Sequence, residues 1–508
     1  MEQSDVLIAG AGPTGLVLAL WLTKAGAKVR IVDKTASPGT TSRALAVQAR
    51  TLELYRQLDL TDAVVARGHR VPAGNFWIKG ERKARIPLQD IGKGLTPYPF
   101  MQIFPQDEHE GLLIERLGAL GVDVERQTEL VSFVESEHGV TARLQGPDGG
   151  EQEHRARYLA GCDGARSKVR ETIGTGFPGG TYRQVFYVAD IDGEGAALDG
   201  ELHIDLDRAD FVAIFPLAGR GRARLIGTVR DERADRAETL TFDDISDHAI
   251  SQMKVSIRKV NWFSTYHVHH RVTQHFRKGR AFLAGDAAHI HSPAGGQGMN
   301  TGIGDAINLA WKLAAVVGGR APDTLLDSYE AERIGFARRL VATTDRAFTF
   351  ATSEGRLAAF VRMYLAPIVI PTAFKFQAVR KFAFRTVSQT AINYRGSRLS
   401  RGSAGRVQGG DRLPWVSIDG SDNFAPLTAI NWQVHVYGTP KPALTAWCEQ
   451  QRVPLHVFDW RAEHDAAGLT RDAFYLLRPD TYVALAEPSG ATDALDRYFR
   501  DQGIRPAP

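Results

Sequence analysis

Cysteine is scarce in this sequence: Cys162 and Cys448 are the only two among 508 residues. Two cysteines cannot form a disulfide framework, and neither has partners at zinc-ligand spacing. His267, His269 and His270 alternate along one segment, but no carboxylate or thiolate cluster accompanies them, so we expect strand histidines and no metal site. For a chain with so few cysteines, a reducing cytoplasm is the simplest compartment.

An excess of charge of one sign is also absent. The chain has 62 Lys and Arg against 58 Asp and Glu, which gives a formal net charge of +4 at pH 7. Over this length, that charge is too weak to indicate binding of nucleic acid or of a membrane. The composition, 43% hydrophobic and 24% charged, is ordinary for a globular protein and excludes wholesale disorder or a fibrous repeat.

Long hydrophobic runs are missing as well. The most apolar stretch of the later chain, residues 364–374, is short and contains Pro367 and Pro371. A membrane-spanning helix needs about 20 apolar residues. The stretch therefore predicts a buried helix or a hydrophobic wall, and no integral membrane association is expected.

The length suggests about three domains. Residues 5–10 form an apolar run of strand type, 16–25 an apolar helix and 29–32 a second strand, which together predict a βαβ unit. From 185 to 229, short alternating runs between Gly- and Asp-rich turns predict an antiparallel sheet. Residues 330–347 predict a long, charged surface helix.

A glycine motif lies between the first strand and the first helix. Gly10, Gly12 and Gly15 match G-x-G-x-x-G: the first glycine allows a tight turn, the second lets backbone approach a pyrophosphate, and the third permits close packing. The helix that follows offers N–H groups and a positive dipole to phosphates. Asp33 ends the second strand, where an acid can bond a ribose hydroxyl. The motif predicts dinucleotide binding and leaves NAD and FAD open.

Three later segments decide between these cofactors. Residues 157–167 end a strand in Asp-Gly, residues 279–289 end another in Gly-Asp, and residues 292–302 are rich in glycine. In this order, and together with the first glycine motif, they resemble the FAD-dependent aromatic hydroxylases, the single-component flavoprotein monooxygenases typified by p-hydroxybenzoate hydroxylase. The matching segments cover roughly the first 350 residues.

The resemblance implies an α/β fold with three parts. A discontinuous, Rossmann-like FAD-binding domain over residues 1–178 and 271–395, connecting helices included, is interrupted by an antiparallel β-sheet substrate domain over 179–270. Residues 396–508 resemble the thioredoxin-like α/β domain of the phenol hydroxylase and pentachlorophenol monooxygenase branch. Cys448 has no Cys-x-x-Cys partner there, so packing or oligomerisation is expected instead of redox chemistry.

Several residues are expected at the cofactor. Asp286 can bond a ribityl hydroxyl, and a helix that begins near Asn300 directs its positive end towards the flavin. The resemblance adds Arg43 at the pyrophosphate and nicotinamide-nucleotide region, and Gln106 at the ribityl chain. Asp163 has an alternative interpretation as a turn former or helix cap. The residues expected to contact FAD are Gly10, Gly12, Pro13, Thr14, Gly15, Asp33, Lys34, Arg43, Gln106, Asp163, Asp286, Pro293, Gly298, Met299 and Asn300.

The resemblance also implies the reaction. NADPH or NADH reduces FAD, O₂ adds at flavin C4a, and the hydroperoxide hydroxylates a phenolic or polycyclic aromatic substrate. Residues 98–101 and 211–217 are expected to line the substrate pocket. No catalytic side chain is assigned firmly: Tyr394 matches a tyrosine-bearing segment of the pentachlorophenol monooxygenase branch, but a buried connector tyrosine fits equally well.

Two alternatives stay open. The same scaffold could support Baeyer–Villiger insertion, epoxidation or dehalogenation, and a different class of protein would bind flavin or ligand without turnover. The expected partners are a small aromatic substrate and O₂, with no nucleic acid, and a homodimer is compatible with the sequence.

Overall fold

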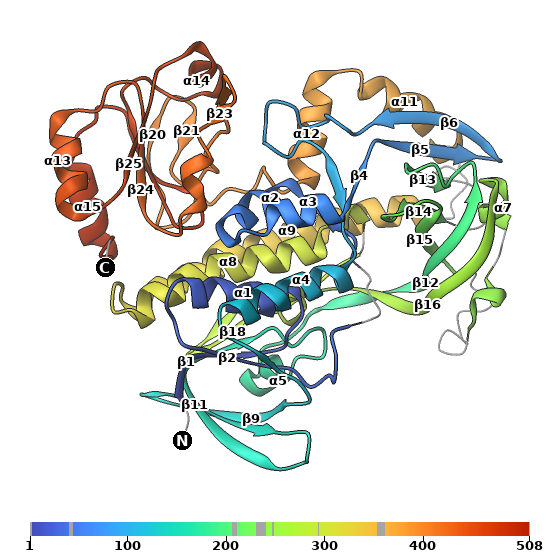
Figure 1. The fold of residues 1–508 in the computed structure, drawn as a ribbon, viewed down its shortest axis with the longest axis horizontal. Coiled ribbons are helices and arrows are strands. Elements are labelled where there is room, and N and C mark those ends of the chain that lie inside the picture. Colours follow the sequence, from blue (N-terminus) through green and yellow to red (C-terminus); the bar gives the residue numbers. More distant parts are fainter. Residues whose placement is uncertain are drawn as a thin grey trace.

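The fold is described from a computed structural model for residues 3–39, 44–205, 211–229, 240–245, 248–292, 294–352 and 361–506. Two large sheets lie side by side and are covered by long helices, and a third sheet belongs to the C-terminal part of the chain (Figure 1). None of the helices in these ranges combines the length and the apolar character needed to cross a bilayer.

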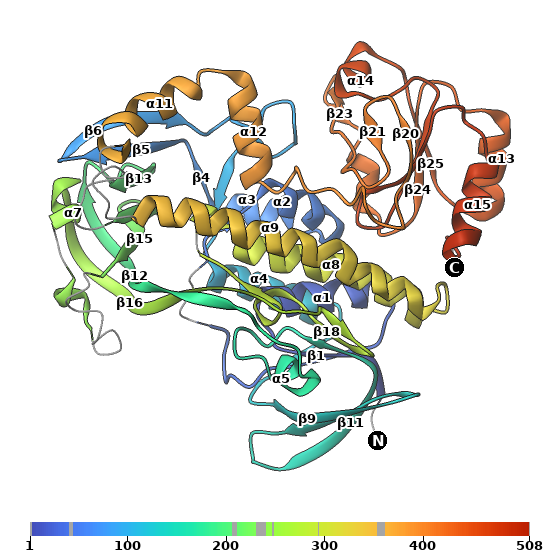
Figure 2. The same ribbon diagram turned by 180° about the vertical axis from the view of Figure 1, so that it is seen from behind.

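The first sheet is the dinucleotide-binding sheet that the βαβ pattern predicts. Its elements, with the helices on it, are β1 (Gln3–Ala9), α1 (Pro13–Lys24), β2 (Val29–Val32), α4 (Gln106–Ala119), β8 (Val124–Glu125), β9 (Glu129–Ser136), β10 (Gly139–Gln145), β11 (Glu151–Gly161), α5 (Lys168–Ile173), β17 (Arg277–Lys278), β18 (Ala281–Leu283) and α8 (Gly298–Val317). The main order is β17-β18-β11-β1-β2-β8, and β18, β11, β1, β2 and β8 run parallel. Residues 16–22 of α1 are fully buried because α1 packs between α4, α8 and the sheet (Figures 1 and 2).

The second sheet is mostly antiparallel, as predicted for the middle of the chain. Its order is β19-β16-β12-β15-β14-β13-β5-β6. Its strands are β5 (Ala73–Ile78), β6 (Glu81–Pro87), β12 (Gly179–Gly195), β13 (Leu202–Asp205), β14 (Val212–Pro216), β15 (Arg222–Thr228), β16 (Val255–Val272) and β19 (His289–Ile290). The first residue of β12 is the first residue of the predicted substrate domain, but β5 and β6 come from much earlier in the chain. This sheet therefore includes a hairpin that the sequence pattern did not assign to it.

Smaller elements join the two sheets. A three-stranded sheet has the order β3-β7-β4, and its residues pack with those of the second sheet in one apolar cluster. These elements are β3 (Ala46–Val47), α2 (Ala49–Tyr55), η1 (Arg56–Leu58), α3 (Thr61–Arg67), β4 (His69–Val71), β7 (Met101–Ile103), η3 (Phe242–Asp244), α7 (His248–Gln252), η4 (Gly285–Ala287) and η5 (Ala294–Gly296).

A series of helices connects these sheets to the C-terminal domain. They are η6 (Asp323–Leu326), α9 (Asp327–Thr352), η7 (Val361–Leu365), α11 (Ala366–Ala373) and α12 (Gln377–Val387). The helix predicted at 330–347 is present as α9, which lies beside α8 (Figure 2). Its expected surface character is wrong near its start, because Glu332 and Arg333 are buried.

The C-terminal domain has a six-stranded sheet with the order β21-β20-β27-β26-β24-β25. Its elements are β20 (Arg401–Ala404), β21 (Val407–Gln408), β22 (Ser417–Ile418), β23 (Ser421–Asp422), η8 (Ala425–Thr428), β24 (Gln433–Tyr437), α13 (Pro442–Gln451), β25 (Leu455–Phe458), α14 (Ala462–Ala467), β26 (Phe474–Leu477), β27 (Val483–Glu487) and α15 (Asp493–Gln502). Parallel β24 and β25 flank α13, β26 is antiparallel to both of its neighbours, β24 and β27, and β27 is parallel to β20, which agrees with a thioredoxin-like fold. Cys448 is buried and free, and burial raises its pKa to about 12.

Buried ion pairs join this domain to α8 and α9. Glu332 accepts hydrogen bonds from Arg478 at 2.7 and 2.9 Å and from Lys312 Nζ at 2.8 Å, and all three side chains are fully buried. Nearby, the indole of Trp311 meets that of Trp432 edge to face at 5.8 Å. Because Arg478 and Trp432 come from the C-terminal domain, separating it from the helices would break buried charge pairs and apolar contacts together.

His109 on α4 makes folding sensitive to acid. Its Nε2 lies 2.8 Å from the Tyr55 hydroxyl, and burial lowers the pKa of His109 to about 3. Below about pH 6.5, His109 is protonated in the unfolded chain but stays neutral in the folded chain. The free energy of unfolding therefore falls as the pH decreases towards 3. We expect His109→Gln to reduce that slope by up to about 1.4 kcal/mol per pH unit near pH 5, measured by denaturant unfolding. The exposed His138→Gln is the control, and an unchanged slope in His109→Gln would contradict this assignment.

Candidate functional site

The three predicted cofactor motifs meet at one edge of the first sheet. β1, β11 and β18 are adjacent parallel strands, so their carboxyl ends lie at the same edge. The segments leaving them are hydrogen-bonded: the Cys162 N–H donates to the Ala9 carbonyl at 2.8 Å, and the Ala284 N–H to the Gly161 carbonyl at 3.0 Å. The glycine loop, the Asp-Gly turn and the Gly-Asp turn therefore belong to one site, at the edge where α/β sheets bind nucleotides.

Two positions of the glycine loop exclude any side chain. Gly10 has a φ of 101°, and a Cβ there would lie 2.3 Å from the Cys162 carbonyl oxygen. A Cβ on Gly15 would lie 1.9 Å from the Gly10 carbonyl oxygen. A Cβ on Gly12 would instead meet no described atom within 4 Å, so the backbone is open on that side.

The start of α1 suits an anion. Pro13 is its first residue, and within the described chain no side chain caps the helix and no acidic residue lies in its first turn. Its N–H groups and positive end are therefore available to phosphate oxygens. The side chain of Thr14 packs against Gly285 and Gly302. A Cβ on Gly285 would lie 2.5 Å from Thr14 Oγ1, and a Cβ on Gly302 would lie 2.3 Å from it. Thr14 thus fills the contact between α1, the Gly-Asp turn and α8.

Asp33 supports the glycine loop from the end of β2. Its Oδ2 accepts a hydrogen bond from the Ala11 N–H at 2.7 Å, and its Oδ1 accepts one from the Thr35 N–H at 2.8 Å. Oδ1 also accepts from the Thr35 hydroxyl at 2.6 Å. Oδ2 keeps a further lone pair, so Asp33 can still accept a ribose hydroxyl there. Lys34 beside it is exposed.

Arg126 is a site residue that sequence reasoning missed. Its Nη1 lies 3.6 Å from Asp33 Oδ1 and donates to Thr35 Oγ1 at 3.2 Å. Its Nη2 is buried and finds no hydrogen-bond partner among the described residues. An unused guanidinium donor beside the glycine loop fits a phosphate or ribose oxygen. The only sequence signal was its place after β8, a two-residue strand too short to recognise.

Asp163 is a helix cap in this structure. Its Oδ1 accepts from the Ser167 hydroxyl at 2.6 Å, and its Oδ2 from the N–H groups of Lys168 and Val169 at 2.7 and 3.2 Å. Burial raises the pKa of Asp163. These contacts favour the alternative weighed for this residue, in which it orders the turn into α5.

The Gly-Asp turn and the start of α8 offer both an acceptor and donors. Asp286 is exposed in η4. Gly298 and Met299 are half-buried in the first turn of α8, where the described chain supplies neither a side-chain cap nor an acidic residue. Asp286 can thus bond a sugar hydroxyl while the N–H groups of α8 bond an electronegative ring atom.

Asn300 positions the surrounding backbone. Its Oδ1 accepts from the Gln48 N–H and the Thr51 hydroxyl, both at 2.8 Å, and its Nδ2 donates to the carbonyls of Ala46 at 2.8 Å and Gly296 at 3.0 Å. These four bonds use the full capacity of the amide. The side chain of Asn300 therefore fixes residues 46–48 against the glycine-rich loop, and only its backbone can face the cofactor.

Gln106 begins α4 on another side of the site. Its Nε2 donates to Glu110 Oε1 at 2.8 Å, and Glu110 Oε2 accepts from the Gly39 N–H at 3.3 Å. Burial raises the pKa of Glu110. Arg43 and Pro293, also predicted at the cofactor, lie outside the described residues.

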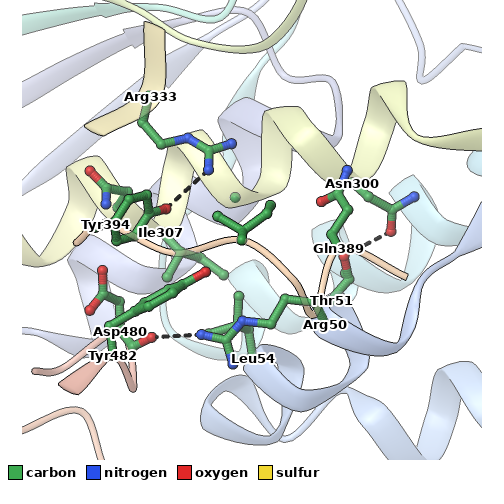
Figure 3. A pocket seen from close by; sticks show the side chains of 13 residues that line it. Arg50, Thr51, Leu54, Asn300, Ile307, Arg333, Gln389, Tyr394, Asp480 and Tyr482 are labelled. Atoms are coloured by element: carbon green, nitrogen blue, oxygen red, sulfur yellow. Dashed lines mark hydrogen bonds between the residues drawn. The ribbon is translucent and has the colours of Figure 1, made fainter. Parts of the chain in front are cut away.

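A buried polar chain connects the Gly-Asp turn to the C-terminal domain. Asp305 Oδ2 accepts from the Gly285 N–H at 3.1 Å and lies 2.6 Å from His289 Nε2, while Asp305 Oδ1 accepts from Arg333 Nε at 2.6 Å. Arg333 Nη1 in turn donates to the Tyr394 hydroxyl at 3.0 Å (Figure 3). Tyr394 is buried, and burial raises the pKa of its hydroxyl far above the usual range.

Tyr394 therefore lies at a domain junction. Figure 3 shows it with Tyr482 and Asp480 around an internal cavity of about 20 Å³, which has room for roughly one water molecule. The rings of Tyr394 and Tyr482 are 4.4 Å apart. A cavity of this size cannot take an aromatic substrate, so these contacts favour the connector interpretation of Tyr394.

The residues fit FAD on chemical grounds. A dinucleotide needs an open backbone at a helix start for its pyrophosphate, an acid for a ribose and a second acceptor for the ribityl chain. Gly12, Asp33 and Asp286 provide these features, and the unpaired Nη2 of Arg126 provides a further cation.

Comparison with known proteins identifies the class. Residues 3–344 match the family model described as an FAD binding domain, so the chain belongs to this FAD-binding family. The 6-methylpretetramide 4-monooxygenase of Streptomyces rimosus is 37% identical over 422 residues, 80% of this chain and 73% of that protein. The 12-dehydrotetracycline 5-monooxygenase/anhydrotetracycline 6-monooxygenase of the same species is 33% identical over 519 residues, 97% and 98% of the two chains.

A solved structure agrees over the whole length. The OxyS anhydrotetracycline hydroxylase from Streptomyces rimosus superposes with a TM-score of 0.80 at 29% identity, and all of both chains is covered. Together these findings show that the chain is an FAD-dependent monooxygenase of the aromatic hydroxylase class. The non-catalytic alternative is therefore set aside.

Arg126 gives a prediction for this site. Arg126→Met keeps the length of the side chain and removes its donors, so we expect FAD to bind about tenfold more weakly, as for one lost charge-assisted hydrogen bond. Flavin fluorescence during titration of the apoprotein measures the dissociation constant. Arg143→Met on β10 is the matched control, because Arg143 is exposed and pairs only with Glu151 among the described residues. Equal affinity of both variants would remove Arg126 from the site.

Proposed function

We propose that this protein uses FAD, NAD(P)H and O₂ to hydroxylate a polycyclic phenol. The observation that carries the proposal is an aromatic wall on the second sheet beside the cofactor motifs. Its half-buried side chains are Tyr182, Phe211, Phe215, Trp262 and Tyr266. They belong to one cluster with Leu45 and Ala46, and the Cβ of Ala46 lies 2.9 Å from the position of a Cβ on Gly296. The wall thus reaches the glycine-rich loop, and its extent suits several fused rings.

The wall agrees in part with the pocket expected from the sequence. Phe211, Phe215 and Leu217 of the 211–217 segment belong to this cluster. From residues 98–101 only Met101 does, whereas Tyr98 packs against the core of the first sheet.

Each part of the cofactor has proposed partners. Gly12, Pro13 and the start of α1 bind the pyrophosphate with Arg126, Asp33 bonds the ribose, and Asp286 bonds the ribityl chain. The start of α8 meets the flavin ring and stabilises negative charge there. When bound, FAD supplies the redox chemistry and the activation of O₂, and the chain supplies orientation and exclusion of water.

Substrate-dependent flavin reduction tests this function. Under anaerobic conditions, polycyclic phenols should speed reduction of the bound FAD by NAD(P)H several-fold more than single-ring phenols do. Reduction that no aromatic compound stimulates would contradict the proposal. The position of ¹⁸O in the product would separate hydroxylation from Baeyer–Villiger insertion, epoxidation and dehalogenation.

Phe215→Ala tests the aromatic wall itself. Losing the ring should raise the KM for the aromatic substrate by about tenfold or more, because a buried phenyl contact is worth about 1.5–3 kcal/mol. FAD affinity should stay unchanged. Phe133→Ala on β9 removes an equally half-buried ring away from the wall and serves as the control. A KM shift of the same size in both variants would count against the wall.

Compartment and assembly are part of the same proposal. A cytoplasmic location fits the two free, buried cysteines. A homodimer stays a prediction from the sequence, and sedimentation velocity of the holoprotein tests it.

A further inference from the structure

An exposed apolar surface lies on the helices that precede the C-terminal domain. α11 packs on β6 and α12 follows it (Figures 1 and 2), and η7 leads into α11. Six large apolar side chains on them, here called the outer helical surface, are exposed by 44% to 74%. They are Tyr364, Leu365, Ile368, Val369, Phe376 and Phe382. The prediction that residues 364–374 form a buried helix or wall is therefore wrong.

Four of these six side chains form one stripe along a helix. The pairs at 364–365 and 368–369 recur at a four-residue spacing, so they form one stripe along the helix. On α12, Phe384 is buried against Gly92, where an added Cβ would lie 2.3 Å from the ring. Phe382 must therefore point outwards, because residues two apart lie on opposite sides of a helix. Single exposed apolar residues are ordinary, but a stripe of them marks an interaction surface.

The helices that carry this face are rich in cations. Residues 361–388 contain five Lys and Arg and no Asp or Glu. This local excess is far stronger than the net charge of +4 for the whole chain suggests. A long segment without acidic residues is suited to an anionic partner.

Cations flank the exposed rings directly. Lys375 precedes Phe376, and Lys381 and Arg385 flank Phe382. Lys375 and Arg385 are exposed, Lys381 is half-buried, and none of these three cations forms an ion pair with another described residue.

We propose that the outer helical surface docks peripherally on an anionic lipid bilayer. Protruding phenyl and aliphatic side chains enter the boundary between headgroups and acyl chains, while Lys and Arg bind lipid phosphates. A second copy of the chain fits less well, because a two-fold contact would place these cations against their own copies without an acid to pair with. Protruding rings also need matching pockets on a protein partner, whereas a bilayer accepts them without any.

The surface is joined to the cofactor site through the end of α12. Gln389 Nε2 donates to the Thr301 hydroxyl at 2.8 Å in the first turns of α8, and the Ser388 carbonyl accepts from the Arg50 N–H at 3.2 Å. The docking face and the flavin-facing helix are thus connected by direct hydrogen bonds.

Vesicle binding of the full-length holoprotein tests the proposal. Vesicles of phosphatidylcholine alone are compared with vesicles that also contain phosphatidylglycerol, and bound protein is measured by co-sedimentation. Phe376→Ser/Phe382→Ser removes the rings, and Lys381→Glu/Arg385→Glu reverses the charge. Val134→Ser, at an exposed valine of β9, and Arg155→Glu/Arg497→Glu, at two exposed arginines elsewhere, are the matched controls. FAD content confirms that every variant is folded.

The outcomes separate the occupants of the surface. We expect the wild type to bind vesicles that contain phosphatidylglycerol. Binding should fall at least about tenfold in Phe376→Ser/Phe382→Ser, and in Lys381→Glu/Arg385→Glu it should no longer depend on lipid charge. Both control variants should bind as the wild type does. No binding by the wild type, or equal binding by the ring variant, would overturn the proposal. A dimer in sedimentation velocity that Phe376→Ser/Phe382→Ser converts to monomer would assign the surface to a second copy. If polyglutamate binds as tightly as the lipid does, and Phe376→Ser/Phe382→Ser leaves that binding unchanged, the surface would be assigned to an acidic protein partner.

Discussion

Replacing Glu332 by alanine is expected to lower the free energy of unfolding by about 3–5 kcal/mol. The Glu332 carboxylate is the counter-ion of Lys312 and shares Arg478 with Asp480, and these side chains are almost completely buried. Alanine would leave the Lys312 ammonium in the interior without a carboxylate. Denaturant unfolding near pH 7 measures the loss, and Glu332→Gln should fall between the wild type and Glu332→Ala.

The pH dependence of this effect has a defined sign. Burial alone would raise the pKa of Glu332, but the charges of Arg478 and Lys312 hold that pKa well below its usual range. The stabilisation is therefore complete above about pH 4.5 and is lost as the pH falls towards the folded-state pKa, so the difference between wild type and variant shrinks in acid. Glu125→Ala is the control, because Glu125 is 40% exposed and its pair with Arg30 should contribute only about 0–1 kcal/mol. Equal losses in both variants would contradict the network.

Replacing Asp286 by alanine is expected to weaken FAD binding by about 10- to 150-fold. This range corresponds to about 1.4–3 kcal/mol for one charge-assisted hydrogen bond to the cofactor. Asp163→Ala should change FAD affinity by less than about threefold, because all three bonds that the Asp163 carboxylate accepts come from the Ser167–Val169 segment, where it orders the start of α5. Titration of each apoprotein with FAD, followed by flavin fluorescence, gives the two dissociation constants.

The thermal stability of the Asp163→Ala and Asp286→Ala apoproteins provides a second comparison. Asp163→Ala removes a helix cap and should destabilise the apoprotein by about 1 kcal/mol, whereas Asp286 is exposed and its loss should change apoprotein stability little. The two variants should thus rank in opposite order for cofactor affinity and for stability. The same order in both measurements would mean that the roles of the two carboxylates are wrongly assigned.

The parts of the site that the sequence predicts are those encoded locally. The glycines at 10, 12 and 15 follow one strand and open one helix, so their geometry depends on a few consecutive residues. Gly285 and Asp286 likewise end a buried strand. Parallel strand order then brings these turns together without any further information.

The parts that the sequence does not predict depend on distant partners. Glu332 and Arg333 look like surface residues of a charged helix, and only Lys312, Arg478 and Asp305, from other segments, explain their burial. A single helix cannot show which of its charged residues will meet a buried partner.

The same limit explains the stretch at 364–374. Its apolar composition favours burial, but the helix packs only one face against β6 and leaves Ile368 and Val369 in solvent. The β5–β6 hairpin was missed because its partner strand β13 lies more than 100 residues away in the chain.

Incorporation of ¹⁸O from ¹⁸O₂ tests the central claim most directly. The reconstituted protein is incubated with NAD(P)H, ¹⁸O₂ and a series of polycyclic phenols, and products are analysed by mass spectrometry. We predict a product that carries one ¹⁸O atom on an aromatic carbon, at a yield that falls in Asp286→Ala in proportion to FAD occupancy. A protein that cannot be loaded with FAD, or one that is loaded and oxidises NAD(P)H without labelling any phenol, would contradict the account.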